Sequence, residues 1–225
     1  MAVLAAGIGF WAVAATRVHT DRSRHERGRP LFGRCYGRFS RRADAGELGV
    51  RRRRLLADAR GRVLDLGAGP GDVFRHLPTA VSGLVAIEPD PTMLKQARCR
   101  LGEAPAPVPL VRGVGERLPF PDAAFDTVVA ALVLCTVDDP HAVVAEIHRV
   151  LCPGGRLLLM EHVRASDEAL ARWQDRLQPL WSWCNGGCRP NRTTLETVRE
   201  AGFRFQALEE YGYPVLPHIQ AQALK

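Results

Sequence analysis

The clearest structural signal in the chain is Val63-Leu64-Asp65-Leu66-Gly67-Ala68-Gly69-Pro70-Gly71-Asp72, an apolar run that ends in a glycine-rich turn. Glycine lacks a Cβ, so such a turn can adopt positive φ and bring its backbone close to a ligand. A helix is expected directly after the turn, at residues 72–77. The pattern is typical of nucleotide and nucleoside sites, and a purely structural tight turn is the alternative.

Short apolar runs bounded by Gly and Pro alternate with amphipathic stretches from Arg62 onward. Such runs are typical of buried parallel strands with helices on both faces, so we expect an α/β fold: a Rossmann-like, doubly wound, mostly parallel sheet of seven strands. The expected strands are residues 63–66, 84–87, 110–112, 127–133, 157–160, 203–208 and 219–224. The further expected helices are residues 91–100, 141–151, 170–183 and 193–201.

The second expected strand ends in a carboxylate, Glu88, followed by Pro89. At the end of a parallel strand this side chain can accept hydrogen bonds from both hydroxyls of a ribose. A solvent-facing acid ahead of a helix cap is the alternative. A dinucleotide-binding dehydrogenase has its third glycine where this chain has Asp72, so that class becomes a weaker alternative.

Three further motifs follow in order: residues 115–121 (Gly-Glu-Arg-Leu-Pro-Phe-Pro), Phe125-Asp126 and residues 149–155 (Arg-Val-Leu-Cys-Pro-Gly-Gly). Together with the glycine turn and Glu88 they resemble the class I methyltransferases. Residues 132–137 and 160–163, with Pro217-His218-Ile219, resemble the methyltransferase-like seven group, whose animal members methylate small thiols. The stretches 187–192 and 201–203 are similar to uncharacterised bacterial relatives.

The resemblance implies S-adenosyl-L-methionine as the methyl donor and a small-molecule acceptor. A thiol is one candidate, and the sequence leaves open whether oxygen, nitrogen, sulfur or carbon is methylated. Many class I members have an acid where this chain has Val114, so adenine recognition is expected to rest on backbone groups around Gly115 and Glu116. His162 is the candidate residue at the acceptor. The expected donor-binding residues are Asp65, Gly67, Ala68, Gly69, Gly71, Glu88, Pro89, Gly115, Glu116 and Leu132.

Several other residues near the expected site have a structural and a functional interpretation. Cys135 ends the fourth expected strand, where a buried thiol is favoured over a nucleophile. His218 is expected to be structural. An aromatic helix is expected to roof an acceptor pocket or to belong to the core; its residues are Trp173, Leu177, Leu180, Trp181 and Trp183.

Positive charge is concentrated at the start of the chain, where residues 1–62 hold 15 Arg against 5 acidic residues. The arginines at 22–29 and 51–54 are expected to form a solvated face or to meet phosphates. Without aromatic interleaving or a DNA-binding motif, specific nucleic-acid binding is not expected. The apolar residues 2–15 are shorter than the roughly 20 residues of a membrane-spanning helix, so weak membrane contact is the expectation.

Cysteine usage fits a reducing cytoplasm, because six cysteines are scattered without a disulfide-type framework. Cys184 and Cys188 have no second pair at zinc-like spacing, so no metal site is expected from the sequence. The expected organisation is a basic arm at residues 1–59 and a methyltransferase domain at 60–225. Two other functions remain open at this point: a nicotinamide-dependent oxidoreductase and a non-catalytic, membrane-associated binding module.

Overall fold

The computed structural model of the chain describes residues 30–225. The apolar stretch at residues 2–15 and the arginines at 22–29 lie outside the described residues. The weak membrane contact expected of the first, and the solvated or phosphate-binding face expected of the second, stay predictions. Within residues 30–225, each helix is too short or too polar to cross a bilayer.

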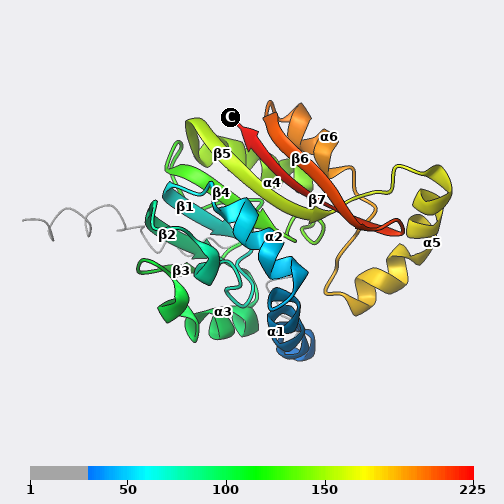
Figure 1. Cartoon of the computed structure of the whole chain (residues 1–225), viewed down its shortest axis with the longest axis horizontal. Coiled ribbons are helices and arrows are strands. Elements are labelled where there is room, and N and C mark those ends of the chain that lie inside the picture. Colours follow the sequence, from blue (N-terminus) through cyan, green and yellow to red (C-terminus); the bar gives the residue numbers. More distant parts are fainter. Residues whose placement is uncertain (1–29) are drawn as a thin grey trace, which may run out of the picture.

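In residues 30–225, seven strands form one sheet in the order β3-β2-β1-β4-β5-β7-β6 (Figure 1). The first five strands run parallel, β7 is antiparallel to β5, and β6 forms a hairpin with β7. The strands are β1 (Gly61–Leu66), β2 (Val81–Ile87), β3 (Leu110–Val111), β4 (Phe125–Ala131), β5 (Leu151–His162), β6 (Arg204–Tyr213) and β7 (Leu216–Leu224). The expected doubly wound, mostly parallel sheet is confirmed.

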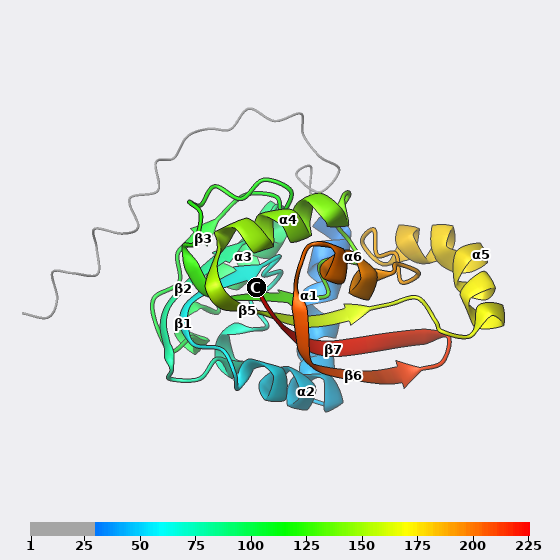
Figure 2. The same ribbon diagram turned by 90° about the horizontal axis from the view of Figure 1, so that it is seen from above.

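Helices cover both faces of the sheet. Figure 2 shows α4 and α6 on one side and α2 on the other. Asp90 and Asp139 cap α3 and α4, each of which opens with a proline. The helices of the described chain are α1 (Pro30–Asp44), α2 (Glu47–Leu56), α3 (Pro91–Arg98), α4 (Pro140–Val150), α5 (Glu168–Cys184) and α6 (Thr194–Glu200).

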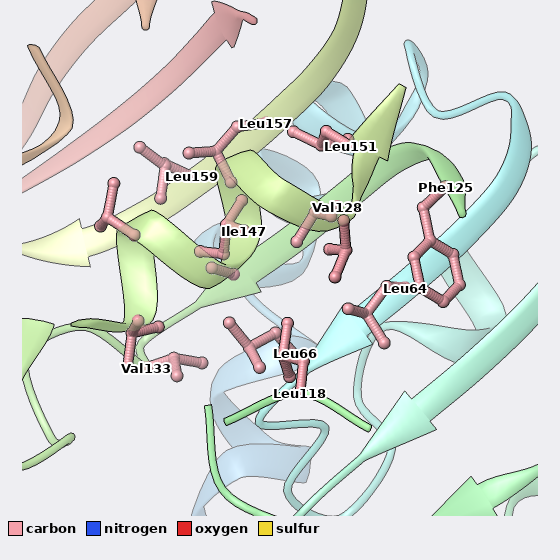
Figure 3. Packing of buried hydrophobic residues seen from close by; sticks show 14 of the residues in the cluster. Leu64, Leu66, Leu118, Phe125, Val128, Val133, Ile147, Leu151, Leu157 and Leu159 are labelled. Carbon is pink, nitrogen blue, oxygen red and sulfur yellow. The ribbon is translucent and has the colours of Figure 1, made fainter. Parts of the chain in front are cut away.

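The core consists of two apolar layers, because neighbouring strand residues point to opposite faces of the sheet. Alternate residues of β1, β4 and β5, such as Leu64, Val128 and Leu157, pack under α4 and α6 together with Phe125 and Ile147 (Figure 3). The intervening strand residues pack under α2 and the segment that follows the glycine turn. This rigid sheet fixes the loops at the carboxyl ends of its strands.

The order of the strands predicts where on the sheet a ligand crevice lies. From β1 the chain proceeds to β2 and β3 on one side, and β4 and β5 then lie on the other side. Open α/β sheets bind ligands outside the carboxyl ends of the strands where the direction of winding reverses. Here that position is the β1–β4 junction, immediately after Leu66 and Ala131.

Two differences from the expected secondary structure lie beside the cavity; elsewhere the bounds shift, most at β5, which begins at Leu151, and at β6, which runs to Tyr213. Residues 72–77 form turns and a short 3₁₀ helix, η1 (Phe74–His76), because Gly71 and Pro78 bracket a stretch too short for a stable α-helix. The strand expected at 127–133 ends at Ala131, because Leu132 has a positive φ of 62°. Such a conformation is uncommon for a residue with a side chain, and it marks the loop that follows β4.

The arginine run in α2 is not a uniform solvated face. Arg52 is 4% exposed and pairs with Asp44, and Arg51 pairs with Glu47 and Glu209. Arg53 and Arg54 are exposed. The residues of α1 and α2 therefore pack against the sheet domain and reach the crevice at its edge.

Candidate active site

A cavity of about 540 Å³ opens at the carboxyl ends of β1, β2 and β4, and α1 and α2 close its other side. Its volume lies in the usual range for small-molecule sites. All but one of the residues expected to bind the donor line it, and His162 lines it as well. The exception is Gly71, which turns the chain beside the Phe74 ring at a φ of 83°.

The glycine turn is shaped to leave space in this cavity. Gly67 has a φ of 63°, and a Cβ built on it would lie 2.7 Å from Cγ2 of Val133. Alanine would therefore be strained and would push on the loop that follows β4. Gly69 also has positive φ, and its amide donates a hydrogen bond of 3.0 Å to Oε2 of Glu88.

Glu88 joins the turn to the start of α3. Its second oxygen, Oε1, accepts the amide of Asp90 at 2.9 Å, and the residue is 8% exposed. Burial raises the pKa of this carboxyl to about 7, although the two backbone hydrogen bonds favour the ionised form. Each oxygen retains a lone pair for a ligand hydroxyl, because a carboxylate oxygen can accept two hydrogen bonds.

The loop after β4 forms the cavity wall next to the turn. The Glu161 carboxylate is fully buried beneath this loop and accepts the amides of Val133, Leu134 and Cys135 at 2.7, 2.8 and 3.2 Å. Burial raises the pKa of Glu161 to about 7, although the three backbone hydrogen bonds favour the ionised form. Glu161 is a positioning residue that sequence reasoning missed. Its position between Met160 and His162 at the end of an expected strand was the available signal.

Like Glu161, Glu116 accepts backbone amides from a loop of the cavity wall. Its Oε1 atom accepts the amide of Asp138 at 3.0 Å and lies 3.4 Å from the amide of Asp139, just before α4. Gly115 is packed against Val143 and Leu66. The carboxylate of Glu116 thus binds backbone amides of its own chain. The expected adenine contacts at this position therefore rest on backbone groups.

Further cavity residues come from α1 and α2, which sequence reasoning assigned to the arm; Tyr36, Ser40 and Arg52 are among them. Ser40 donates a hydrogen bond to Asp72, and burial raises the pKa of Tyr36 well above its usual value. Phe32, Tyr36 and Phe39 follow a helical spacing. That spacing was the signal that α1 packs on the domain.

The other end of the cavity is formed by His162, His218, Trp181 and the two thiols of Cys135 and Cys188. Cys188 is buried beside Cys135, whereas Cys184 is exposed. Hydrogen bonding from Cys135 and from His162 lowers the pKa of Cys188 to about 5. Burial and the neighbouring His162 lower the pKa of His218 to about 4, so His218 is neutral near pH 7.

The three tryptophans of helix α5 differ in their surroundings. Trp181 lines the cavity, but Trp173 and Trp183 are 54% and 78% exposed. Leu177 and Leu180 are also exposed. The group therefore neither roofs the pocket as a unit nor belongs to the core, because α5 extends beyond the end of β5 (Figure 1).

A doubly wound sheet with an antiparallel last strand is the class I methyltransferase fold, and the glycine turn and the carboxylate after β2 lie where that fold leaves room for a ligand. The comparisons with known proteins agree. Residues 64–159 match the family model described as a methyltransferase domain. The chain is 33% identical over 172 residues to the thiol S-methyltransferase TMT1B of Rattus norvegicus, covering 72% of this chain and 70% of that protein.

One further relative agrees on the class, and one solved structure agrees on the fold. The chain is 35% identical over 119 residues to the ubiquinone/menaquinone biosynthesis C-methyltransferase UbiE of Shewanella oneidensis, covering 51% of this chain and 47% of that protein. A SAM-dependent methyltransferase structure from Thermotoga maritima superposes with a TM-score of 0.65 at 22% identity, covering 87% and 98% of the two chains. The chain therefore belongs to the class I S-adenosylmethionine-dependent methyltransferases and is related to the thiol S-methyltransferases. This membership decides against the nicotinamide-dependent oxidoreductase and the non-catalytic module.

The residues that line the cavity fit S-adenosylmethionine. Oδ2 of Asp65 and Nε of Arg52 are buried and make no hydrogen bond within residues 30–225. Both residues line the cavity, so a carboxylate and a guanidinium are available for the ammonium and carboxylate of an amino acid. Glu88 is available for the ribose hydroxyls. A buried polar atom without a partner is costly, and a ligand that pairs with it removes that cost.

The pKa of Glu88 predicts how donor binding depends on pH. Above pH 7 the carboxylate is charged and accepts strong hydrogen bonds, whereas below pH 7 it becomes a neutral and weaker acceptor. We expect the Kd for S-adenosylmethionine to rise about tenfold as the pH is lowered from 8 to 6, measured by titration calorimetry. In the Glu88→Gln variant the Kd is expected to be higher and this pH-dependent component absent. Equal pH slopes for the two proteins would assign the dependence to another group.

Proposed function

We propose that this methyltransferase transfers the methyl group to the sulfur of a small apolar thiol. The observation that carries the proposal is the composition of the cavity end distant from Glu88. Aromatic and aliphatic side chains enclose it. Its polar groups are the imidazoles of His162 and His218 and the two thiols, and Tyr211, Asn185 and Arg51 lie beside them. Within the described chain, the acids that line the cavity are Glu47, Asp65, Asp72, Glu88, Asp90 and Glu116.

These acids have other partners: Asp65 is assigned to the ammonium of the donor, and Asp90 caps α3. Glu47 is paired with Arg51, and Asp72 is paired with Arg100 at 2.5 Å. Glu88 and Glu116 accept backbone amides, as described above. An amine arrives as an ammonium ion and would have no carboxylate partner there, which is costly in an enclosed site. A neutral thiol or its thiolate suits this environment better. The thiol S-methyltransferases among the relatives support the same choice.

The chain's own residues mainly bind, orient and exclude water. S-adenosylmethionine supplies a methyl group that its sulfonium already activates. The protein therefore needs to hold the acceptor sulfur in line with that carbon and to keep solvent out. Trp181 from α5 and Phe32 and Tyr36 from α1 close the acceptor end, and Phe32 packs directly on Gly186. The thiolate is the attacking form, so activity is expected to rise with pH toward the pKa of the acceptor thiol.

The test is transfer from labelled S-adenosylmethionine to a panel of small thiols, phenols, amines and quinol precursors. We expect label in thioethers, with apolar thiols preferred over charged ones. Trp181→Ala should raise KM for an apolar thiol several-fold while leaving the Kd of the donor unchanged, and Trp183→Ala, four-fifths exposed on the same helix, is the matched control. Label that appears only in a phenol, amine or quinol product would overturn the proposal.

A further inference from the structure

Three side chains from distant parts of the sequence meet at the acceptor end of the cavity. They are Cys135 after β4, His162 at the end of β5, and Cys188 in the loop after α5. The Sγ atoms of Cys135 and Cys188 each lie 3.6 Å from Nδ1 of His162, and the three atoms lie within 4.8 Å of one another. Both cysteines are buried, at 1% and 5% exposure, and His162 is partly exposed.

These distances match a metal coordination shell. Tetrahedral zinc, with Zn–S of about 2.3 Å and Zn–N of about 2.0 to 2.1 Å, places a sulfur and a nitrogen ligand about 3.6 Å apart. Two cysteines and one histidine are also the ligand set of a known kind of catalytic zinc site, in which the fourth position stays open. We propose that Cys135, Cys188 and His162 bind one zinc ion, with an open coordination position that faces the cavity.

The backbone holds these ligands in place. Glu161 accepts the amide of Cys135 and those of the two preceding residues, which fixes the loop after β4. The amide of Arg189 donates to the carbonyl of Cys135 at 2.6 Å, and this bond joins the Cys188 loop to the same point. The Arg192 side chain donates to the carbonyls of Leu134 and Val137. The site is therefore preorganised, which lowers the cost of binding a metal.

The surroundings also suit a pair of thiolates. The indole N–H of Trp181 is buried next to Cys188 and makes no hydrogen bond within the described chain, so a thiolate sulfur there would give it a partner. Outer hydrogen bonds of this kind orient metal ligands and tune the metal. Two thiolates and a neutral imidazole around Zn²⁺ leave no net charge, which removes the cost of burying a lone ionised group.

The open position gives the metal a role that rests on the proposed function. An acceptor thiol that coordinates zinc exchanges its S–H bond for an S–Zn bond and releases the proton to solvent. The sulfur lone pair then forms the bond to the methyl carbon while that carbon's bond to the donor sulfonium breaks, and the bonding electrons stay on the donor sulfur. The product is a neutral thioether, a weaker ligand that leaves the metal.

The test measures the metal directly. The full chain is reduced, freed of metal by a chelator, and titrated with Zn²⁺ or Co²⁺. We expect about one metal per chain by elemental analysis, and a visible Co²⁺ spectrum with the strong bands of tetrahedral sulfur coordination. Cys135→Ser, Cys188→Ser and His162→Ala each remove a ligand, so each should weaken metal binding by more than the about 10- to 100-fold typical of losing an outer hydrogen-bond partner. Cys184→Ser, an exposed thiol four residues from Cys188, is the matched control and should bind as the parent does. Circular dichroism confirms that each variant is folded.

The remaining outcomes separate the site from the function. Addition of a small thiol without donor should shift the Co²⁺ spectrum, and an unchanged spectrum would overturn the open position. Three results would overturn the site. They are metal binding that survives in folded Cys188→Ser, a reduced chain that binds no zinc, and a Cys135–Cys188 disulfide that persists in the reductant. If the metal binds as expected and no thiol is methylated, the site stands and the proposed acceptor falls.

Discussion

Replacement of Glu88 by alanine is expected to raise the Kd for S-adenosylmethionine at least about 100-fold. The side chain is 8% exposed, it lines the cavity, and both of its oxygens can accept a further hydrogen bond. Hydrogen bonds to a charged group contribute about 1.5 to 3 kcal/mol each, so the loss of two corresponds to about 3 to 6 kcal/mol. Since about 1.4 kcal/mol is tenfold in affinity, 100-fold is the lower end of this range.

The fold is expected to survive this change. Burial already disfavours the ionised Glu88, and the amides of Gly69 and Asp90 that lose their acceptor border a cavity that water can enter. Titration calorimetry gives the donor affinity, and circular dichroism and the thermal midpoint report the fold. Glu88→Gln keeps one acceptor oxygen and should fall between the parent and alanine. Glu210→Ala, an exposed acid on β6, is the control for loss of a charge. An alanine variant that folds and binds the donor as tightly as the parent contradicts the ribose assignment.

The sequence allows the residues that line the proposed donor half of the cavity to be predicted, because their signals are local. The glycine turn and Glu88 each follow a buried strand within a few residues, and the carboxyl ends of parallel strands meet at one edge of the sheet. The regular alternation of apolar residues likewise predicts the strand set, while strand ends such as Ala131 depend on the positive φ of Leu132.

The acceptor half depends on contacts between distant segments, which spacing alone does not encode. In the sequence, Cys184 is the nearest cysteine to Cys188 and would be its partner in a metal site. In the fold, Cys188 instead lies beside Cys135 and His162. Arg52 belongs to an arginine run that favours a solvated face, yet its position on α2 buries it against Asp44. Both cases are tertiary effects that override a local pattern.

The second large effect concerns Asp44, at the end of α1, whose replacement by alanine is expected to lower the free energy of unfolding by about 3 to 5 kcal/mol. Its carboxylate is fully buried and contacts Arg52 of α2, Arg75 of η1 and, at 3.0 Å, Nε2 of His76. Removal of one partner of a buried ion pair leaves the other charge without compensation, which costs about this much. Arg52 is only 4% exposed, so it is the charge that would be left behind.

The pKa of Asp44 gives an independent check on this network. Burial opposes its ionisation, but hydrogen bonds from His76 and Arg75 and the charge of Arg52 lower the pKa to about 2. An acid with a lowered pKa stabilises the folded state above its unfolded pKa of about 3.9, and this stabilisation is lost as the pH falls toward 2. The difference between the parent and Asp44→Ala should therefore be constant from pH 5 to 7 and shrink below pH 4.

Urea denaturation at several pH values measures both effects in one series. Asp58→Ala is the matched control, because Asp58 is exposed just after α2 and its loss should change stability by less than about 0.5 kcal/mol. Asp44→Asn preserves the shape without the charge and should show an intermediate loss. Because Arg52 and Ser40 also line the donor cavity, detachment of α1 and α2 in Asp44→Ala should weaken donor binding as well. An alanine variant as stable as the Asp58 control would mean that these helices are held to the domain by their apolar contacts alone.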